Sequence, residues 1–328
     1  MQIEYSKLFP ARQTNRRHAK GALLLTLLLA SHFAAKPASA QPASAQAARL
    51  LKQMMSAERN ANYTAVQTLA RRNSAPVRVR IWRLGRKRRL EYLAPDLNRG
   101  DILVDDGQNT WLYHRAENAA VQTRSQAPRD GNNASRRAAR VRLSGQESVG
   151  GRAAWKIDLV RPNGKGIARR VWIDKASGLR LSAQVFDAQG QAAERMTLSD
   201  LKTSGVDASR FRWTPPNGAQ VVRTSGQLFS QFAPAKATAS WLQSPSFVPA
   251  GYMFESAVVD NAKGEAWLRY ASSTRRISLF QQRAADATST GAAPQKVGGG
   301  WYRAANGSRV LIVGAPDGVA QRILKSVR

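Results

Sequence analysis

The chain has 328 residues, no cysteine and three histidines, and its 51 basic residues against 21 acidic ones give a net charge of +30. The missing cysteines exclude disulfides, thiolate metal sites and thiol catalysis, and the scarce histidines exclude a histidine-rich zinc site. A positive field of this size attracts polyanions of any kind.

Residues 1–40 have the features of an export signal. Three basic residues at 16–20 precede an apolar stretch at 21–35, and the small-x-small triplet at 38–40 is typical of signal-peptidase cleavage. A second triplet at 43–45 leaves the cut position open, and an arginine pair leaves both Sec and twin-arginine export open. The apolar stretch is shorter than the roughly 20 residues that span a bilayer, which argues against an uncleaved anchor. We therefore predict a cleaved leader and a mature protein without a transmembrane segment.

His114 is the one histidine beyond this leader. It ends an apolar strand pattern at 110–114, where a surface or packed histidine is far more common than a catalytic base. A serine–histidine–aspartate site would have to be built on this residue alone.

The roughly 288 residues after the leader exceed what one small core usually organises. We predict a first domain at 46–222, a linker at 223–244 with a short helical stretch, and a smaller domain at 245–328.

The first domain is predicted to begin with an amphipathic helix at 46–59. Leu50, Leu51, Met54 and Met55 form one apolar stripe at helical spacing. Such a helix needs an apolar surface to cover.

A long series of strand patterns follows the helix. At 76–81 the alternation is strict and places Val77, Val79 and Ile81 on one face, with arginines on the other. Further strands are predicted at 88–93, 100–104, 109–115, 120–124, 141–149, 153–160, 168–174, 179–186 and 193–201. Their number, without βαβ spacing, predicts a mainly β (α+β) protein with a large antiparallel sheet. A sheet this wide must curl, and a half-barrel that does not close needs a helix or a ligand to cover its concave face.

Bulky apolar residues on these strands are the candidates for a ligand-holding face. Most of them are expected to be plain core, and the remainder would line a cavity for an acyl chain or a peptide. The candidates are Val79, Ile81, Leu90, Tyr92, Trp111, Tyr113, Trp155, Ile157, Leu159, Val171 and Ile173.

The excess of positive charge is concentrated in the first domain, with a basic cluster at 71–89 and a second run at 124–142 that includes a polar loop. These residues predict a surface for anionic lipid head groups, lipopolysaccharide or an acidic protein segment. Nucleic acid is not expected as the partner of an exported protein. The alternative is that a GC-rich genome enriches arginine and that these are solvated faces. The candidates are Arg78, Arg80, Arg86, Lys87, Arg88, Arg89, Arg136, Arg137 and Arg140.

The second domain is predicted to be a small α+β unit. Strands are expected at 252–259, 265–271 and 275–283, and a hairpin at 301–313 follows a segment of low complexity. An amphipathic helix at 317–327 closes the chain.

Catalytic motifs are missing from the sequence. It contains no GxSxG elbow, no HExxH pair, no phosphate-binding glycine loop and no EF-hand spacing. The paired carboxylates Asp105 and Asp106 precede Gly107, which is the composition of a hairpin turn. We predict a protein that is not an enzyme and binds no cofactor or metal.

Several segments of the first domain are similar to the lipoprotein-carrier fold of LolA and LolB. They are the helix with its apolar stripe, the NYT entry to a strand at 62–64, the hairpin at 105–113 and the phrase FRWTPPNG at 211–218.

The second domain resembles the C-terminal domain of the MucB/RseB proteins. FVPAGY at 247–252, RY at 269–270, ISLF at 277–280 and SRVLIVG at 308–314 occur in the same order and spacing, followed by the terminal helix. The resemblance covers residues 46–328 and implies a LolA-like half-barrel joined to a smaller α+β domain.

The resemblance also implies a function. Such proteins are periplasmic, bind the periplasmic segment of a single-span anti-sigma factor, shield it from proteolysis, and release it when envelope stress presents lipopolysaccharide or mislocalised lipoprotein. It supplies no motif that assigns partner contacts to single residues. Two alternatives remain: a periplasmic lipid or lipoprotein carrier, and an envelope scaffold that binds polyanions.

Overall fold

The computed structural model describes residues 43–126, 140–285 and 292–327. The predicted leader, most of the polar loop with Arg136 and Arg137, and part of the low-complexity segment lie outside these residues. Within the described residues, no helix has the length and apolar character needed to cross a bilayer.

A twelve-stranded sheet forms the larger part of the fold, in the order β12-β6-β5-β4-β3-β2-β1-β11-β10-β9-β8-β7. Its strands are β1 (Asn62–Arg71), β2 (Val77–Leu84), β3 (Lys87–Ala94), β4 (Ile102–Asp105), β5 (Asn109–His114), β6 (Ala119–Arg124), β7 (Arg140–Val149), β8 (Arg152–Val160), β9 (Ile167–Asp174), β10 (Arg180–Phe186), β11 (Ala192–Lys202) and β12 (Gln220–Arg223). Two meanders, β1–β6 and β7–β11, join through the antiparallel pair β1–β11. Among the strands that the structure describes, only β12 pairs in parallel, with β6. The predicted large antiparallel sheet is confirmed.

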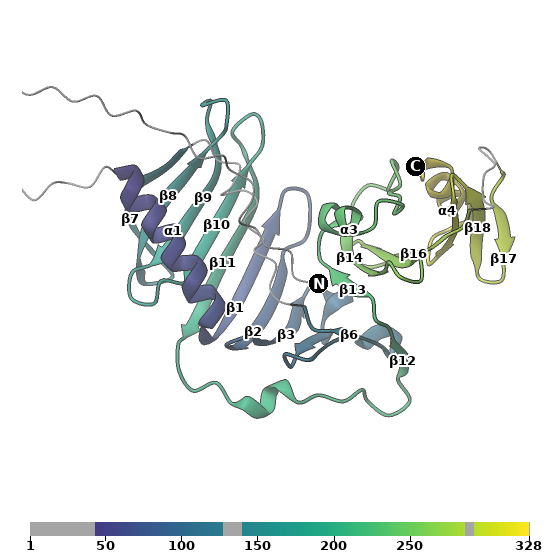
Figure 1. Cartoon of the computed structure of the whole chain (residues 1–328), viewed down its shortest axis with the longest axis horizontal. Helices are drawn as coiled ribbons and strands as arrows, with labels where there is room; N and C mark the ends of the chain where they lie inside the picture. Colours follow the sequence, from purple (N-terminus) through teal and green to yellow (C-terminus); the bar gives the residue numbers. More distant parts are fainter. Residues whose placement is uncertain (1–42, 127–139, 286–291, 328) are drawn as a thin grey trace, which may run out of the picture. The chain divides into compact units, whose positions relative to one another are not determined.

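Helix α1 (Ala43–Asn60) runs across strands β7–β11 (Figure 1). Its apolar stripe packs through Leu50, Leu51 and Met54 onto a row of strand residues that includes Ile157 and Val171. Because apolar side chains at helical spacing must lie against an apolar surface, the stripe predicted from the sequence covers one half of this face.

The second sheet has seven strands in the order β13-β14-β15-β16-β19-β18-β17. They are β13 (Gln227–Phe229), β14 (Met253–Asp260), β15 (Glu265–Ala271), β16 (Arg276–Arg283), β17 (Gln295–Val297), β18 (Gly300–Ala305) and β19 (Ser308–Val313). Helices α3 (Phe232–Thr238) and α4 (Asp317–Ser326) share its core, in which Leu268, Leu279 and Ile312 have no exposed surface. β13 and α3 fall within the segment predicted as a linker.

Candidate functional site

A cavity of about 830 Å³ lies over part of the large sheet. Val79, Ile81, Leu90 and Tyr92, four of the predicted ligand-face residues, contribute to its wall. The register explains why they share a face, since Val79 pairs with Tyr92 and Ile81 with Leu90 across β2 and β3. The wall continues through Val77 of β2 and along neighbouring strands through Leu69, Leu103 and Met196.

Residues of the second sheet and the segments around it complete the lining. They include Leu228, Met253, Phe254 and Glu255, and the residues 271–273 that begin the β15–β16 hairpin. A volume in the range of small-ligand sites, with apolar residues on the large sheet, fits a ligand with an apolar part.

Charged side chains also reach this cavity. Arg71 pairs with Glu194 at 2.8 Å, and Arg180 pairs with Glu58 of α1 at 3.2 Å. Burial, followed by the neighbouring Arg180, lowers the pKa of Arg169, which also lines the cavity. The wall is therefore apolar on one side and rich in arginine on another, as an amphiphile with an anionic group would require. Arg169 and Arg180 were not predicted as site residues from the sequence, although Arg169 precedes Val171 by two residues and so falls on the same face.

The other half of the predicted ligand face lies under α1. Trp155, Ile157, Leu159, Val171 and Ile173 all belong to the cluster that packs on this helix, and the last four are at most 3% exposed. The concave face thus has two parts. Helix α1 covers the part on β7–β9, and the cavity lies over the part on β1–β4.

The placement of Trp111 and Tyr113 with Leu90 on one face was wrong. Leu90 pairs with Leu103, whereas Trp111 pairs with Val104, the next residue along β4. Neighbouring strand residues point to opposite sides of a sheet, so the two aromatic residues face away from the cavity.

Trp213 covers these two aromatic residues on the opposite face. Its ring centroid lies 5.6 Å from that of Trp111 and 5.5 Å from that of Tyr113. Just before it, η3 (Ala208–Phe211) buries Phe211. The FRWTPPNG segment therefore closes a second apolar layer on the convex side, away from the cavity.

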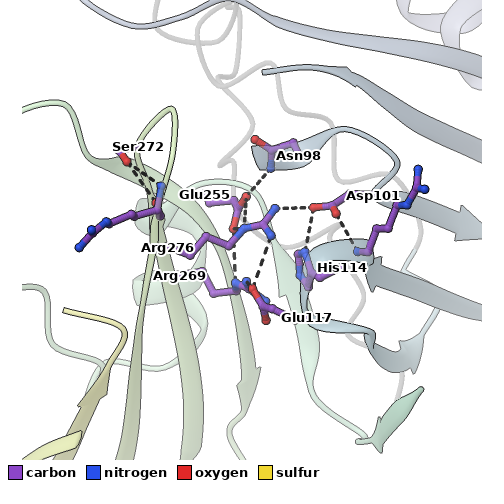
Figure 2. Close-up of polar contacts among 10 residues, drawn as sticks. Asn98, Asp101, His114, Glu117, Glu255, Arg269, Ser272 and Arg276 are labelled. Carbon is purple, nitrogen blue, oxygen red and sulfur yellow. Dashed lines mark hydrogen bonds and ion pairs between the residues drawn. The ribbon is translucent and has the colours of Figure 1, made fainter. Parts of the chain in front are cut away.

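A cluster of buried charges joins the large sheet to β14–β16 at the edge of the cavity (Figure 2). Asp101 precedes β4 and binds Arg276 at the start of β16. Glu117, at the end of η2 (Arg115–Glu117), binds Arg269 of β15. Glu255 of β14 lies between the two arginines, at 3.2 Å from Arg276 and 3.3 Å from Arg269.

His114 belongs to this cluster as a packed residue. Its Nδ1 lies 3.0 Å from Oδ2 of Asp101, both side chains are at most 3% exposed, and its Nε2 is buried without a hydrogen-bond partner among the described residues. The backbone N–H of Arg115 donates to the other oxygen of Asp101 at 2.9 Å. The arrangement orients Asp101 towards Arg276.

The pKa values follow from this environment. Burial by itself raises the pKa of Asp101, but the hydrogen bond from His114 and the charge of Arg276 outweigh it and hold that pKa below its ordinary value. Burial lowers the pKa of Arg276 and the charges of Glu255 and Asp101 raise it, with a net rise. Burial, with Glu255 and Asp101 nearby, raises the pKa of Tyr92 to about 12. Asp101 and Arg276 are therefore both charged at neutral pH.

Gly314 allows the chain to pass close to Arg276. It has a φ of +85°, and a Cβ at this position would lie 2.6 Å from the carbonyl oxygen of Arg276. A glycine is needed there because the side chain of any other residue would displace the start of β16.

The predicted basic surface is only partly a free surface. Arg78, Arg80, Arg86, Lys87 and Arg140 are exposed. Arg88 is also exposed, but it lies 3.7 Å from Asp105 and contributes to the cavity wall. By contrast, Arg89 is half-buried, lies 2.8 Å from Glu91 and donates to the backbone of Arg210.

Asp105 and Asp106 hold a turn, as their composition predicted. Asp105 accepts hydrogen bonds from the N–H of Gly107 and the hydroxyl of Ser125, while Asp106 accepts from the N–H groups of residues 108 and 109. Both carboxylates are thus engaged in local structure.

Comparison with known protein families shows which family the larger sheet matches. The model of the MucB/RseB N-terminal domain matches residues 46–217, just over half of the chain. The chain belongs to the MucB/RseB family. A comparison with curated proteins gives no match.

Solved structures similar to this MucB/RseB-family chain include two complexes. A crystal structure of MucB with MucA(peri) has 19% identity and a TM-score of 0.42, over 86% of this chain and 98% of the other. The Pseudomonas aeruginosa MucA/MucB complex has 18% identity and a TM-score of 0.42 over the same shares. A LolA superfamily protein from Nitrosomonas europaea has 12% identity and a TM-score of 0.26, over 51% of this chain and 97% of the other. The family assignment rests on the family model.

Proposed function

We propose that this protein is a periplasmic regulatory binding protein that docks on the periplasmic segment of a single-span anti-sigma factor. The observation that carries the proposal is the match of residues 46–217 to the MucB/RseB N-terminal domain. In this proposal residues 1–40 are a cleaved signal peptide, residues 46–222 are the LolA-like half-barrel, and residues 245–328 are the C-terminal domain, joined by the segment 223–244. The protein performs no catalysis and controls access to its partner by binding it.

The cavity supports a second component of the proposal, the sensing of a lipid or of the acyl chains of a lipoprotein. Its volume, its apolar wall on β1–β4 and its arginines suit an anionic amphiphile such as lipopolysaccharide or another acyl ligand. The release of the partner on envelope stress would follow from ligand binding here. The same cavity favours a lipid or lipoprotein carrier of the LolA type as the alternative function.

The partner is expected to meet positive charge on the β2–β3 hairpin. Arg86 and Lys87 are exposed, and Arg88 and Arg89 follow them. An acidic or amphipathic partner segment bound to this surface would lose affinity as salt rises, because exposed charges are screened within about 10 Å at 0.1 M ionic strength.

Affinity capture of the exported protein from envelope extracts, followed by mass spectrometry, tests the proposal. We expect recovery of a single-span membrane protein, and weaker recovery when residues 86–89 are all changed to Ser. The matched control changes four exposed lysines on other elements to Ser and should leave recovery unchanged; they are Lys52, Lys165, Lys263 and Lys325. Recovery of lipids alone would contradict the regulator and favour the carrier.

Native mass spectrometry of the purified protein tests whether the cavity holds a lipid. A co-purified acyl ligand is the result expected if the cavity holds lipid. A mass equal to that of the polypeptide alone, retained after incubation with lipopolysaccharide or fatty acid, would contradict lipid binding and leave the partner interaction standing.

A further inference from the structure

The two sheets have separate apolar cores. The core of the second sheet is built from its own strands and helices, and the apolar clusters of the large sheet contain none of its residues among those described. Among the described residues, the polar side-chain contacts between the sheets include the charge cluster, the hydrogen bond from Asn98 to Glu255 at 2.8 Å, and the hydrogen bond from the hydroxyl of Ser74 to the sulfur of Met253.

Ionic contacts of this kind separate at a lower cost than apolar ones. Bringing charges together in the interior loses their hydration, and this loss offsets much of the attraction between them. When the contact opens, water hydrates the charges again, whereas an opened apolar contact gains no such compensation. Separation of the two sheets at this cluster therefore costs less free energy than separation of an apolar contact of similar size would.

The charge count of the cluster strengthens this argument. The carboxylates of Asp101, Glu117 and Glu255 face the guanidinium groups of Arg269 and Arg276, so the acids outnumber the arginines by one. The side chains of Arg269, Arg276 and Asp101 are at most 5% exposed, while that of Glu117 is 40% exposed. Water and ions reach the cluster from the side of Glu117.

The cluster also adjoins the wall of the cavity. Asn98 and Glu255 belong both to the cluster and to the lining of the cavity. Residues 272 and 273, in the turn of the β15–β16 hairpin, also line the cavity, and Arg276 is the first residue of β16 after this turn. Figure 2 shows Glu255 and Arg276 reaching from the second sheet towards Asn98 and Asp101 of the large sheet. Movement of this hairpin away from Asp101 would open the cavity on that side.

We propose that the Asp101–Arg276 and Glu117–Arg269 contacts form a releasable latch, which holds the β15–β16 hairpin and the start of β14 as a closable wall of the cavity. Release separates Arg276 from Asp101 and admits a ligand, and high salt favours the released state. The latch acts on the cavity whether or not the protein binds an anti-sigma factor, so it stands independently of the proposed function.

The absence of cysteine in the chain makes a distance measurement direct. Cysteines replace Ala75, on the β1–β2 connection, and Thr274, at the tip of the β15–β16 hairpin. Both positions are exposed. With a nitroxide label on each cysteine, double electron–electron resonance spectroscopy gives the distribution of distances between the two labels at 50 mM and 1 M salt. We expect one short-distance population at low salt and a growing long-distance population at high salt.

Arg276→Met is the variant that breaks the latch, and Arg170→Met is its matched control. Arg170 also pairs with a buried aspartate, Asp158, which keeps Arg142 as a second partner at 3.0 Å, just as Asp101 keeps His114. Loss of Arg276 should raise the ratio of long to short distances by about tenfold or more, since loss of a partner from a buried pair costs several kcal/mol. Arg170→Met should leave the distribution unchanged.

Two results would overturn the latch. One is a distribution that stays the same in Arg276→Met and at both salt concentrations. The other is equal broadening in Arg276→Met and Arg170→Met, which would show general loosening. If Arg276→Met does not fold, the milder Arg276→Lys replaces it, because a lysine keeps the positive charge but cannot reproduce the several hydrogen bonds that the guanidinium donates to Glu255 and Asp101. It should shift the distribution in the same direction by a smaller factor, and no shift would refute the latch.

Discussion

The packing of α1 on the concave face can be tested at Leu159. This side chain is 2% exposed and lies in the cluster that joins β8 and β9 to the helix. Replacement of Leu159 by Ala removes about three methyl or methylene groups from this contact and leaves a space that the helix and two strands cannot fully close. Buried Leu→Ala changes lower the free energy of unfolding by about 2–5 kcal/mol. Because the site lies between a helix and a sheet, where some collapse can occur, we expect about 3 kcal/mol.

Urea denaturation, followed by tryptophan fluorescence and circular dichroism, measures this loss. Val222→Ala is the control, since Val222 is 54% exposed on edge strand β12 and should lower the free energy of unfolding by less than about 0.5 kcal/mol. A loss below about 1 kcal/mol for Leu159→Ala, close to the control, would show that α1 does not cover β8 and β9. The description of the concave face as covered by α1 in one part and open as a cavity in the other would then be wrong.

Three further predictions concern the cavity wall, the convex face and acid stability. Ile81→Glu should abolish uptake of a fluorescent fatty acid, because an unpaired carboxylate would lie among the apolar residues of the cavity wall; unchanged uptake would place the ligand elsewhere. Trp213→Ala should lower the free energy of unfolding by about 1–2 kcal/mol through lost ring contacts and leave uptake intact, whereas lost uptake would put these rings in the ligand site. The pKa values of Asp101, Asp158 and Asp174 are lowered in the folded protein, where hydrogen bonds from their partners outweigh the opposing effect of burial. The unfolded chain therefore binds protons first, so the free energy of unfolding should fall as pH drops below 3.8. Urea titrations at pH 7 and pH 3 check this, and a smaller pH effect in the Asp158→Asn variant is expected; equal stability at the two pH values would contradict the assignment.

The sequence was informative where short-range patterns decide the structure. The helical spacing of Leu50 to Met55 predicted α1 and its covering role, and the alternation at Val77–Ile81 predicted β2 and its buried face. Hairpin turns with glycine at positive φ, such as Gly107, marked the ends of strands. These features depend on residues a few positions apart, and one sequence displays them.

The features that the sequence did not reveal depend on long-range pairing. The face of Trp111 is set by the register of β4 against β5, and a shift of one residue reverses it. The partners of the charge cluster lie 152 residues apart for Glu117 and Arg269, and 175 for Asp101 and Arg276. β13 and β17 have only three residues each, too few for an alternating pattern. Arginines in a basic chain give no signal of which of them are buried.

A binding titration tests the central claim most directly. The chain from residue 41 is mixed with the purified periplasmic segment of the single-span anti-sigma factor encoded beside a sigma-factor gene in the same genome, and heat of binding is measured at 50 mM and 300 mM salt. The account predicts saturable binding that weakens at the higher salt. No binding at either concentration, with the protein folded by circular dichroism, would contradict it.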